Sequence, residues 1–275
     1  MGAAFVEEPG AAAAVRRLVA EGVSPWLEGV PGVGPYRMAE FADRLTVRNL
    51  LYGVPRRPAA LGAVCDVLLA RGGLVAAPPP GDGCSYDAAR ALVAAVDRPN
   101  LIVVLPASGE GPAAGARLLG EGVGVCFGPM TGPRTYEGVL GAWLSGLERA
   151  RERGLDLAAL PAFASLRVCE LGPLAVPTAR LLYARYDRAL GGKRWRSLAA
   201  AGARPHRLLW TALGDRAEDL PGLIGWGTAA ALTLRALQGL PALRGDTLSP
   251  PCTGPRAPAP ALTSESSLDH DHGGT

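Results

Sequence analysis

Lysine is the side chain best suited to forming an imine, and it occurs once in the 275 residues, as Lys193. The other 27 of the 28 basic side chains are arginine. An amine attacks a carbonyl only in its neutral form, which requires burial or a neighbouring cation that lowers its pKa. Lys193 lies in the polar segment GGKRW, and the adjacent Arg194 cannot share its face of a helix. We therefore expect Lys193 to be exposed and to have no catalytic role.

The cysteines and histidines are a second source of nucleophilic or metal-binding chemistry. Cys126 and Cys169 fall at or near the ends of expected strands, but a catalytic thiol needs a histidine or a cation beside it. The one histidine outside the C-terminal segment is His206, in a loop, and no CxxC pair occurs. We expect reduced, mostly buried and inert thiols, and no metal or other cofactor. The five cysteines are Cys65, Cys84, Cys126, Cys169 and Cys252.

Two carboxylates could form an acid–base pair. Glu28 follows a short apolar stretch in SPWLEGV, and Glu170 follows another in AFASLRVCE. A carboxylic acid and a carboxylate near a reacting bond can serve as general acid and general base. The simpler interpretation is that each is solvated or paired with a nearby arginine such as Arg167. The residues alone leave both interpretations open.

The composition argues against two classes of partner. The formal net charge is only +3, and the arginines are dispersed without interleaved aromatic side chains, so nucleic acid is not an expected partner. No apolar run reaches the roughly 18–20 residues of a membrane helix, and the first residues lack the basic and apolar parts of a leader peptide. We expect a cytoplasmic protein without a membrane partner.

Apolar stretches and helical patterns alternate along the chain. The segment NLIVVLP at 100–106 is the clearest strand, because it is short, rich in branched residues and ended by a proline. This alternation predicts an α/β protein with a parallel sheet. Beyond about residue 244 proline, serine and acidic residues prevail, so we expect a folded domain at 1–243 and a disordered tail at 244–275. The other expected strands are 24–30, 122–128, 162–168 and 207–213, and the expected helices are 8–22, 36–45, 58–71, 85–96, 109–120, 134–153, 174–190, 193–201 and 227–239.

Three long segments resemble transaldolase, in particular the longer bacterial type. They are AVDRPNLIVVLPASGEG at 95–111, the stretch 118–160 and the stretch 179–215. The resemblance implies a (β/α)8 barrel of the TIM type, with its chemistry at the carboxyl ends of the strands. It also implies transfer of a dihydroxyacetone unit between sugar phosphates of the pentose phosphate pathway, through a lysine imine. The chain is shorter than the family between Asn49 and Leu74 and at about 170–178, so we expect a shortened or incomplete barrel.

The resemblance also places other side chains where the family has catalytic groups. The family segment reads roughly NLLIKIPAT, and in NLIVVLPAS the position of its lysine is Val104, which cannot form an imine. The family's proton-transfer glutamate falls on Ala77, and an arginine that holds substrate phosphate falls on Glu170. Its asparagine and threonine on another strand fall on Cys126 and Gly128.

A few functional residues of the family have counterparts in this chain. The aspartate of the family motif WLDDL corresponds to Glu28 in WLEGV, and a strand serine corresponds to Ser165. Asn49 corresponds to the asparagine of a TTNP turn, and Arg216 stands near a second basic position that contacts phosphate. The resemblance therefore implies that Asn49, Ser165 and Arg216 bind substrate, and that Glu28 and Ser165 are residues of the old catalytic set.

These departures favour a degenerate, transaldolase-like protein that has lost Schiff-base transfer and binds a sugar phosphate or regulates carbohydrate metabolism. The nucleophile, the proton-transfer acid and a phosphate arginine are replaced together, which favours this pseudoenzyme interpretation. Two alternatives stay open. One is an enzyme of altered chemistry on the same scaffold, using Glu28, Glu170 or a cysteine. The other is an active transaldolase. The expected ligand is a sugar phosphate, and the sequence names no protein partner.

Overall fold

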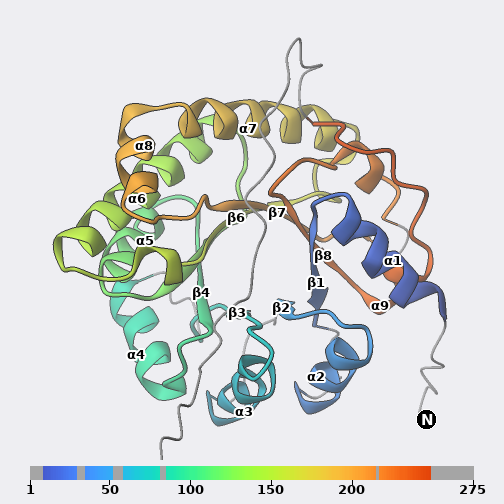
Figure 1. Ribbon diagram of the computed structural model, residues 1–275, viewed down its shortest axis with the longest axis horizontal. Helices are drawn as coiled ribbons and strands as arrows, with labels where there is room; N and C mark the ends of the chain where they lie inside the picture. The colour runs from blue at the N-terminus through green and yellow to red at the C-terminus, as the bar shows by residue number, and fades with distance from the viewer. Residues whose placement is uncertain (1–8, 30–34, 52–57, 81–84, 215–216, 249–275) are drawn as a thin grey trace, which may run out of the picture.

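Eight parallel strands close into a barrel in the computed structural model of the chain (Figure 1). The structure describes residues 9–29, 35–51, 58–80, 85–214 and 217–248. The strands follow one another around the barrel in chain order, and the last pairs in parallel with the first. The predicted (β/α)8 barrel of the TIM type is confirmed. The strands are β1 (Ser24–Glu28), β2 (Asn49–Leu51), β3 (Val75–Ala77), β4 (Leu101–Leu105), β5 (Gly124–Phe127), β6 (Ala162–Arg167), β7 (Arg207–Thr211) and β8 (Ala229–Leu232).

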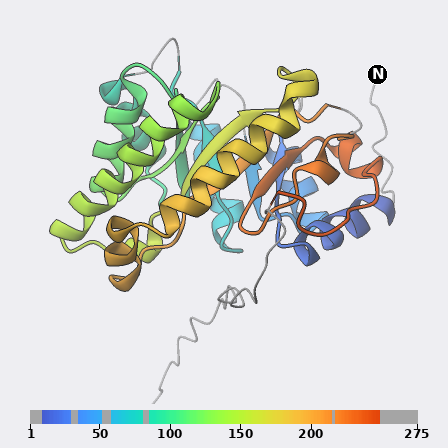
Figure 2. The same cartoon turned by 90° about the horizontal axis from the view of Figure 1, so that it is seen from above.

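Helices surround the strands. They are α1 (Pro9–Ala20), α2 (Pro35–Arg44), α3 (Pro58–Leu69), α4 (Tyr86–Val96), α5 (Gly111–Gly120), α6 (Pro133–Glu152), α7 (Ala175–Leu190), α8 (Lys193–Ala200) and α9 (Leu234–Gln238), with short 3-10 turns at Leu157–Ala159, Gly172–Leu174 and Leu220–Gly222. Figure 1 shows α2 beside α3, α5 between α4 and α6, and α1 beside α9. Figure 2 shows α7 as a long helix along the outside of the barrel, with α8 at its end.

The expectation of an incomplete barrel is wrong. Strands β2 and β3 have only three residues each, and they lie at the two ends of the part of the chain that is shorter than the resembling family. They nevertheless pair with each other, Leu51 beside Ala76, and β3 pairs with β4 over all three of its residues. The connection between them still contains α3, so the chain is shorter here without losing a strand.

Side chains along the strands alternate between two apolar layers, as the pleat of a strand requires. The larger layer lies between the strands and the helices. The smaller one fills the barrel interior, and the register places its members beside one another, for example Trp26 beside Ala231 and Ala76 beside Ile102. This alternation decides which side chains can reach a site inside the barrel. The interior layer consists of Trp26, Ala76, Ile102, Cys126, Phe163, Leu209, Ala229 and Ala231, with Leu51, Leu74 and Val104 packed against it.

The predicted helix at 227–239 is wrong in its first half. Ala229–Leu232 form strand β8, and only Leu234–Gln238 form a helix. The segment GTAAALTLRALQG has a helical pattern because alanine and leucine are strong helix formers. Tertiary packing overrides that propensity, since β8 closes the barrel between β7 and β1 with all four of its residues buried. The small side chain of Ala231 leaves room for the indole of Trp26 beside it.

Trp210 stabilises the connection from β7 to β8. Outside residues 215–216, which the structure does not describe, this connection contains a 3-10 turn and no α-helix. Trp210 is fully buried in the outer layer, and its indole N–H donates to the carbonyl of Leu223 at 2.9 Å. Trp210 therefore has a packing role.

The folded part of the chain extends past the predicted boundary at residue 243. The hydroxyl of Thr247 donates to the carbonyl of Pro221 at 2.9 Å. Leu248 is 4 % exposed, and its backbone N–H donates to the carbonyl of Ile224 at 3.0 Å. The chain is therefore packed on the barrel as far as Leu248. The rest of the predicted tail, 249–275, lies outside the described residues.

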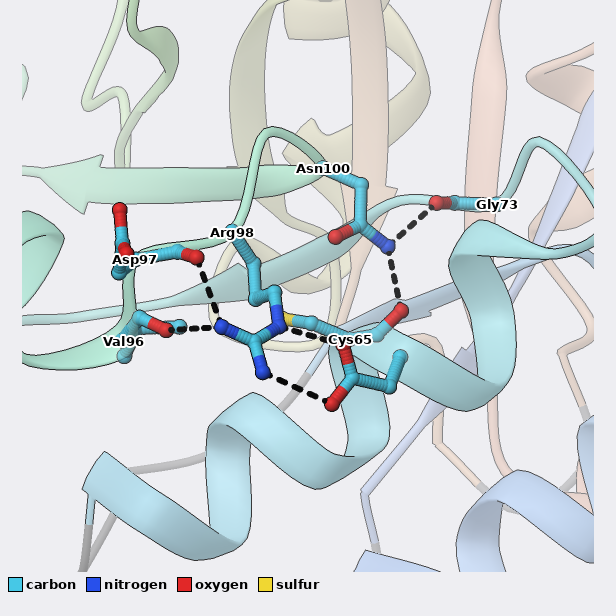
Figure 3. Close-up of polar contacts among 7 residues, drawn as sticks. Cys65, Gly73, Val96, Asp97, Arg98 and Asn100 are labelled. Atoms are coloured by element: carbon cyan, nitrogen blue, oxygen red, sulfur yellow. Dashed lines mark hydrogen bonds and ion pairs between the residues drawn. The ribbon is translucent and has the colours of Figure 1, made fainter.

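Asn100, the asparagine that opens NLIVVLP, ties three elements together (Figure 3). Its side chain is almost fully buried, and Nδ2 donates to the carbonyls of Cys65 and Gly73, both at 2.9 Å. These bonds join the end of α3, the loop into β3 and the start of β4. Nearby, the guanidinium of Arg98 forms an exposed ion pair with Asp66 on α3. The asparagine of this segment therefore has a structural role.

We predict that Asn100→Ala lowers the free energy of unfolding by about 2 kcal/mol, because two hydrogen bonds are lost and their buried carbonyls lose a donor. Urea unfolding followed by circular dichroism measures the change. Asp66→Ala is the matched control on the same elements, and it should have a much smaller effect because its ion pair is exposed. Equal losses in the two variants would contradict the role assigned to Asn100.

Candidate functional site

The carboxyl ends of four strands bring five interior-facing side chains to one end of the barrel. These mouth residues are Glu28, Val104, Cys126, Ser165 and Arg167. Val104 lies beside Cys126 in the register, and Glu28 and Arg167 are the last residues of their strands. Catalytic residues of (β/α)8 barrels lie at this end, because the loops that follow the strands surround it. The mouth is therefore the candidate site.

Below the mouth the barrel interior is filled. Trp26 is fully buried and meets the ring of Phe163 edge-on, with 4.9 Å between ring centroids. Ile102 and Leu209 are also fully buried and belong to the same interior layer. Any ligand of the mouth must therefore bind above this layer.

Val104 is the half-buried residue of β4, whose other four residues are buried. It packs against the interior layer and faces the same way as Ile102, two residues earlier. A side chain at position 104 therefore points into the barrel near its open end. Valine offers only methyl groups there, so this position supplies shape and no reactive group.

Glu28 is the carboxyl group at the end of β1, and the fold changes its pKa. Burial raises the pKa of Glu28 above its ordinary value. The positive charge of Arg167 and a hydrogen bond from the backbone N–H of Ala212 lower it again, but by less than burial raises it. A carboxyl group with a raised pKa can hold a proton closer to neutral pH, as a general acid must.

Arg167 interacts with both candidate carboxylates. Its Nε lies 2.9 Å from a carboxylate oxygen of Glu170, and both side chains are about half exposed. The positive charge of Arg167 also lowers the pKa of Glu28. Glu170 is therefore paired with a local arginine, as the simpler interpretation predicted. One cation and two carboxylates leave this side of the mouth with no excess of positive charge.

Cys126 and Ser165 form a small buried polar contact. The Ser165 hydroxyl makes a hydrogen bond with the Cys126 thiol. Burial raises the pKa of Cys126 to about 12, so the thiol stays protonated and is a poor nucleophile. Gly128 lies against the same serine, and a Cβ built at position 128 would be 1.7 Å from Ser165 Oγ. The threonine of the resembling family therefore does not fit here while Ser165 keeps its place.

Within the described ranges, the contacts of His206 are with aromatic side chains and not with a cysteine. It is buried in an aromatic cluster, where Tyr136 Oη lies 2.7 Å from its Nε2 and the rings of Trp143 and Tyr186 pack against it. Burial lowers the pKa of His206 to about 3, so the imidazole is neutral at physiological pH. It serves the packing of α6 and α7 against β7, and it does not activate Cys126.

The structure does not bring Asn49 to the mouth. Asn49 begins β2, at the amino end of the barrel, where its Nδ2 donates to Ser24 Oγ at 3.3 Å. Its Oδ1 accepts from the backbone N–H of Leu74 at 3.1 Å. Both partners also lie at or before the starts of their strands. The prediction that Asn49 binds substrate beside Ser165 is therefore wrong, because a residue that opens a strand lies at the opposite end from the mouth.

Other predicted positions also need correction or stay undescribed. Ala77 faces the outer layer, and it is Ala76 that faces the interior. A glutamate that faces the interior would therefore stand at position 76, because neighbouring residues of a strand face opposite sides of the sheet. The alignment with Ala77 is wrong by one residue. Lys193 is exposed at the start of α8, as predicted. Arg216 lies outside the described residues.

Arg167 is a mouth residue that the sequence suggests only as an ion-pair partner for a carboxylate. Its position follows from the alternation along a strand, since it stands two residues after Ser165 and faces the same way. No group of three or more potential metal-ligating side chains occurs among the described residues. None of the described helices is both long enough and apolar enough to cross a membrane.

Curated relatives of the chain are transaldolases. The chain is 36 % identical over 188 residues to the transaldolase of Acidothermus cellulolyticus, which covers 58 % of this chain and 50 % of that protein. It is 34 % identical over 189 residues to that of Thermobifida fusca, covering 58 % and 51 %, and 34 % identical over 191 residues to that of Frankia alni, covering 59 % and 52 %. The chain thus spans about half the length of the curated relatives it matches, and no family model matches it.

Among solved structures, the chain is similar to a deoxyribose phosphate aldolase from Aeropyrum pernix that was described as a tetramer. The likeness has a TM-score of 0.40 and 14 % sequence identity, and it covers 85 % of this chain and 96 % of that one. A likeness this weak bears on neither substrate nor assembly.

We predict that Glu28→Gln raises the stability of the fold at neutral pH. A carboxyl group whose pKa is raised by folding contributes stability in its protonated form, and that contribution is lost as the pH rises through the raised pKa. Glutamine stays uncharged at every pH, so the gain over wild type should shrink as the pH falls and vanish below the ordinary value of 4.5. Melting temperatures of the two proteins between pH 4 and pH 8 measure this gain.

The control is Glu170→Gln, which removes an exposed ion pair and should show no such gain. Equal gains in the two variants would refute the assignment of the Glu28 effect to burial.

Proposed function

We propose that the chain is a transaldolase-family barrel that no longer forms a Schiff base. The observation that carries this proposal is Val104, an interior-facing residue near the open end of β4, at the position where the resembling family has its lysine. An imine needs a primary amine. The one lysine of the sequence, Lys193, lies on the exposed start of α8. The similarity to curated transaldolases supports the family, and the missing amine argues against their activity.

Two further positions support the loss of aldol chemistry. Neither Ala76, on the interior face of β3, nor Ala77, on the other face, has a carboxyl group that could move a proton. Glu170, which takes the place of a phosphate-holding arginine in the family, brings a negative charge to the mouth. A phosphate group is repelled by a carboxylate and attracted by an arginine, so this exchange weakens a dianion site.

We propose that the mouth binds the hydroxylated carbon chain of a sugar phosphate without converting it. Ser165 and Glu28 supply groups that exchange hydrogen bonds with hydroxyls, and Arg167 supplies one contact for the phosphate. Such binding without turnover is compatible with a regulatory role in carbohydrate metabolism.

We predict that borohydride reduction in the presence of fructose 6-phosphate leaves no covalent adduct on the protein, because position 104 carries no amine. Intact-mass spectrometry after reduction measures this. A working transaldolase treated in parallel is the positive control. An adduct that maps to Lys193, and that disappears in Lys193→Arg, would overturn the proposal.

We predict that fructose 6-phosphate raises the melting temperature of the protein and that fructose does so less. Saturating ligand at about 100 times Kd adds about 2.7 kcal/mol of stability to the folded state. Arg167→Gln should reduce the difference between the two sugars, and the control Arg180→Gln, at an exposed position of α7, should leave it unchanged. The absence of any shift with either sugar would contradict binding at the mouth.

An enzyme of altered chemistry on this barrel is the second candidate, and the raised pKa of Glu28 favours it. The partly buried carboxyl group of Glu28, at the same mouth as the hydroxyl of Ser165, could act as a general acid in a proton transfer that needs no imine. Incubation of the same sugar phosphates followed by mass spectrometry distinguishes the two. Product formation by the wild type that is lost in Glu28→Gln would favour this alternative over binding alone.

A further inference from the structure

A cavity outside the barrel lies where α4, α5 and the end of α6 meet. These helices are neighbours on one side of the barrel (Figure 1). The cavity has a volume of about 340 Å³, near the lower end of the range for small-molecule sites. Glu121, one of its residues, precedes β5 and so lies toward the amino end of that strand, away from the mouth. The cavity is lined by Tyr86, Arg90, Gly120, Glu121, Arg153 and Leu155.

Arginine side chains dominate the charge of this cavity. Arg90 and Arg153 line it, and Arg117 stacks its guanidinium on the ring of Tyr86, 3.4 Å from the ring centroid. Glu121 is the carboxylate that lines the cavity with them. The two lining guanidinium groups and the one carboxylate give this arginine pocket a formal charge of +1, and Arg117 adds a further positive charge next to the Tyr86 ring. The excess of positive charge favours a negatively charged occupant.

Internal contacts hold these side chains in place. Tyr86 donates its hydroxyl to Glu121 Oε1 at 2.5 Å, and Arg90 Nε lies 3.4 Å from Glu121 Oε2. Glu121 Oε2 is buried and makes this ion pair without a hydrogen bond. Arg153 donates through Nη1 to the carbonyl of Gly120 at 2.9 Å. Each arginine is therefore anchored through one part of its planar group, so less freedom is lost when a ligand binds the remaining N–H groups.

We propose that the arginine pocket binds the phosphate group of a small molecule. Arg90 on α4 and Arg153 just after α6 both line the cavity, and in the described part of the chain Arg153 forms no ion pair with a carboxylate and Arg90 pairs only with Glu121. Guanidinium groups match phosphate oxygens in pairs, and charge-assisted hydrogen bonds of this kind are among the strongest in proteins. The volume accommodates a phosphate together with a short carbon unit, so inorganic phosphate and a phosphate monoester share the required chemistry.

The test is a titration of the full chain with inorganic phosphate at constant ionic strength, followed by isothermal calorimetry. The variant Arg90→Gln/Arg153→Gln removes two charges from the pocket. The matched control Arg180→Gln/Arg188→Gln removes two charges from the exposed face of α7. Arg167→Gln reports on the barrel mouth. A parallel titration with glycerol 3-phosphate compares a phosphate monoester with the free ion.

We expect saturable phosphate binding by the wild type, at least a tenfold rise in Kd for Arg90→Gln/Arg153→Gln, and unchanged Kd for the α7 control and for Arg167→Gln. Tighter binding of glycerol 3-phosphate would identify a monoester as the ligand, and equal binding would identify the phosphate group alone. Circular dichroism verifies that each variant is folded. Absent binding, or an equal loss in the pocket variant and the α7 control, would overturn the proposal, because screening of surface charge would then account for the effect.

Discussion

The interior of a closed eight-stranded barrel has a fixed volume, and Trp26 occupies a large part of it. The indole meets Phe163 edge-on, and the neighbouring interior positions Ala76 and Ala231 are small enough to accommodate both rings. Because this layer is packed, groups that face a ligand must come from the last residues of the strands. The chemistry of the barrel therefore depends on a few side chains at the carboxyl ends, and a single exchange such as valine for lysine at position 104 changes what the site can do.

The two candidate sites differ in their electrostatics: burial favours uncharged groups at the mouth, whereas positive charge prevails at the arginine pocket. At the mouth, burial favours the uncharged forms of Glu28 and Cys126, and the half-exposed Arg167 is paired with Glu170. Little positive charge is left there for a phosphate. The arginine pocket has the opposite balance, because two guanidinium groups and one carboxylate line it and a third guanidinium group stacks on Tyr86. A protein that binds a hydroxylated chain in one place and a phosphate in another would use both environments.

Several elements were predictable because their signals are local. The apolar run of β4 ends at a proline, and Ser85 caps α4 by accepting from the backbone N–H of Ala88 at 3.2 Å. The errors arose where local signals are weak or overruled. Strands of three residues, such as β3, show too little alternation to assign a face, and the interior-facing residue of β3 is Ala76, whereas the resemblance aligns the family glutamate with Ala77. The alanine-rich β8 has helical propensity, and only its place between β7 and β1 makes it a strand.

By itself the sequence determined the chemical inventory of the protein: one lysine, no amine at position 104, and an alternation of strands and helices typical of a parallel barrel. These are properties of the residues and their neighbours in the chain. Only the tertiary structure decided that the barrel closes, that Asn49 lies at the end opposite Ser165, and that Arg90 and Arg153 line one cavity. The reason is that orientation depends on register and closure, which couple residues far apart in the chain and which no local pattern records.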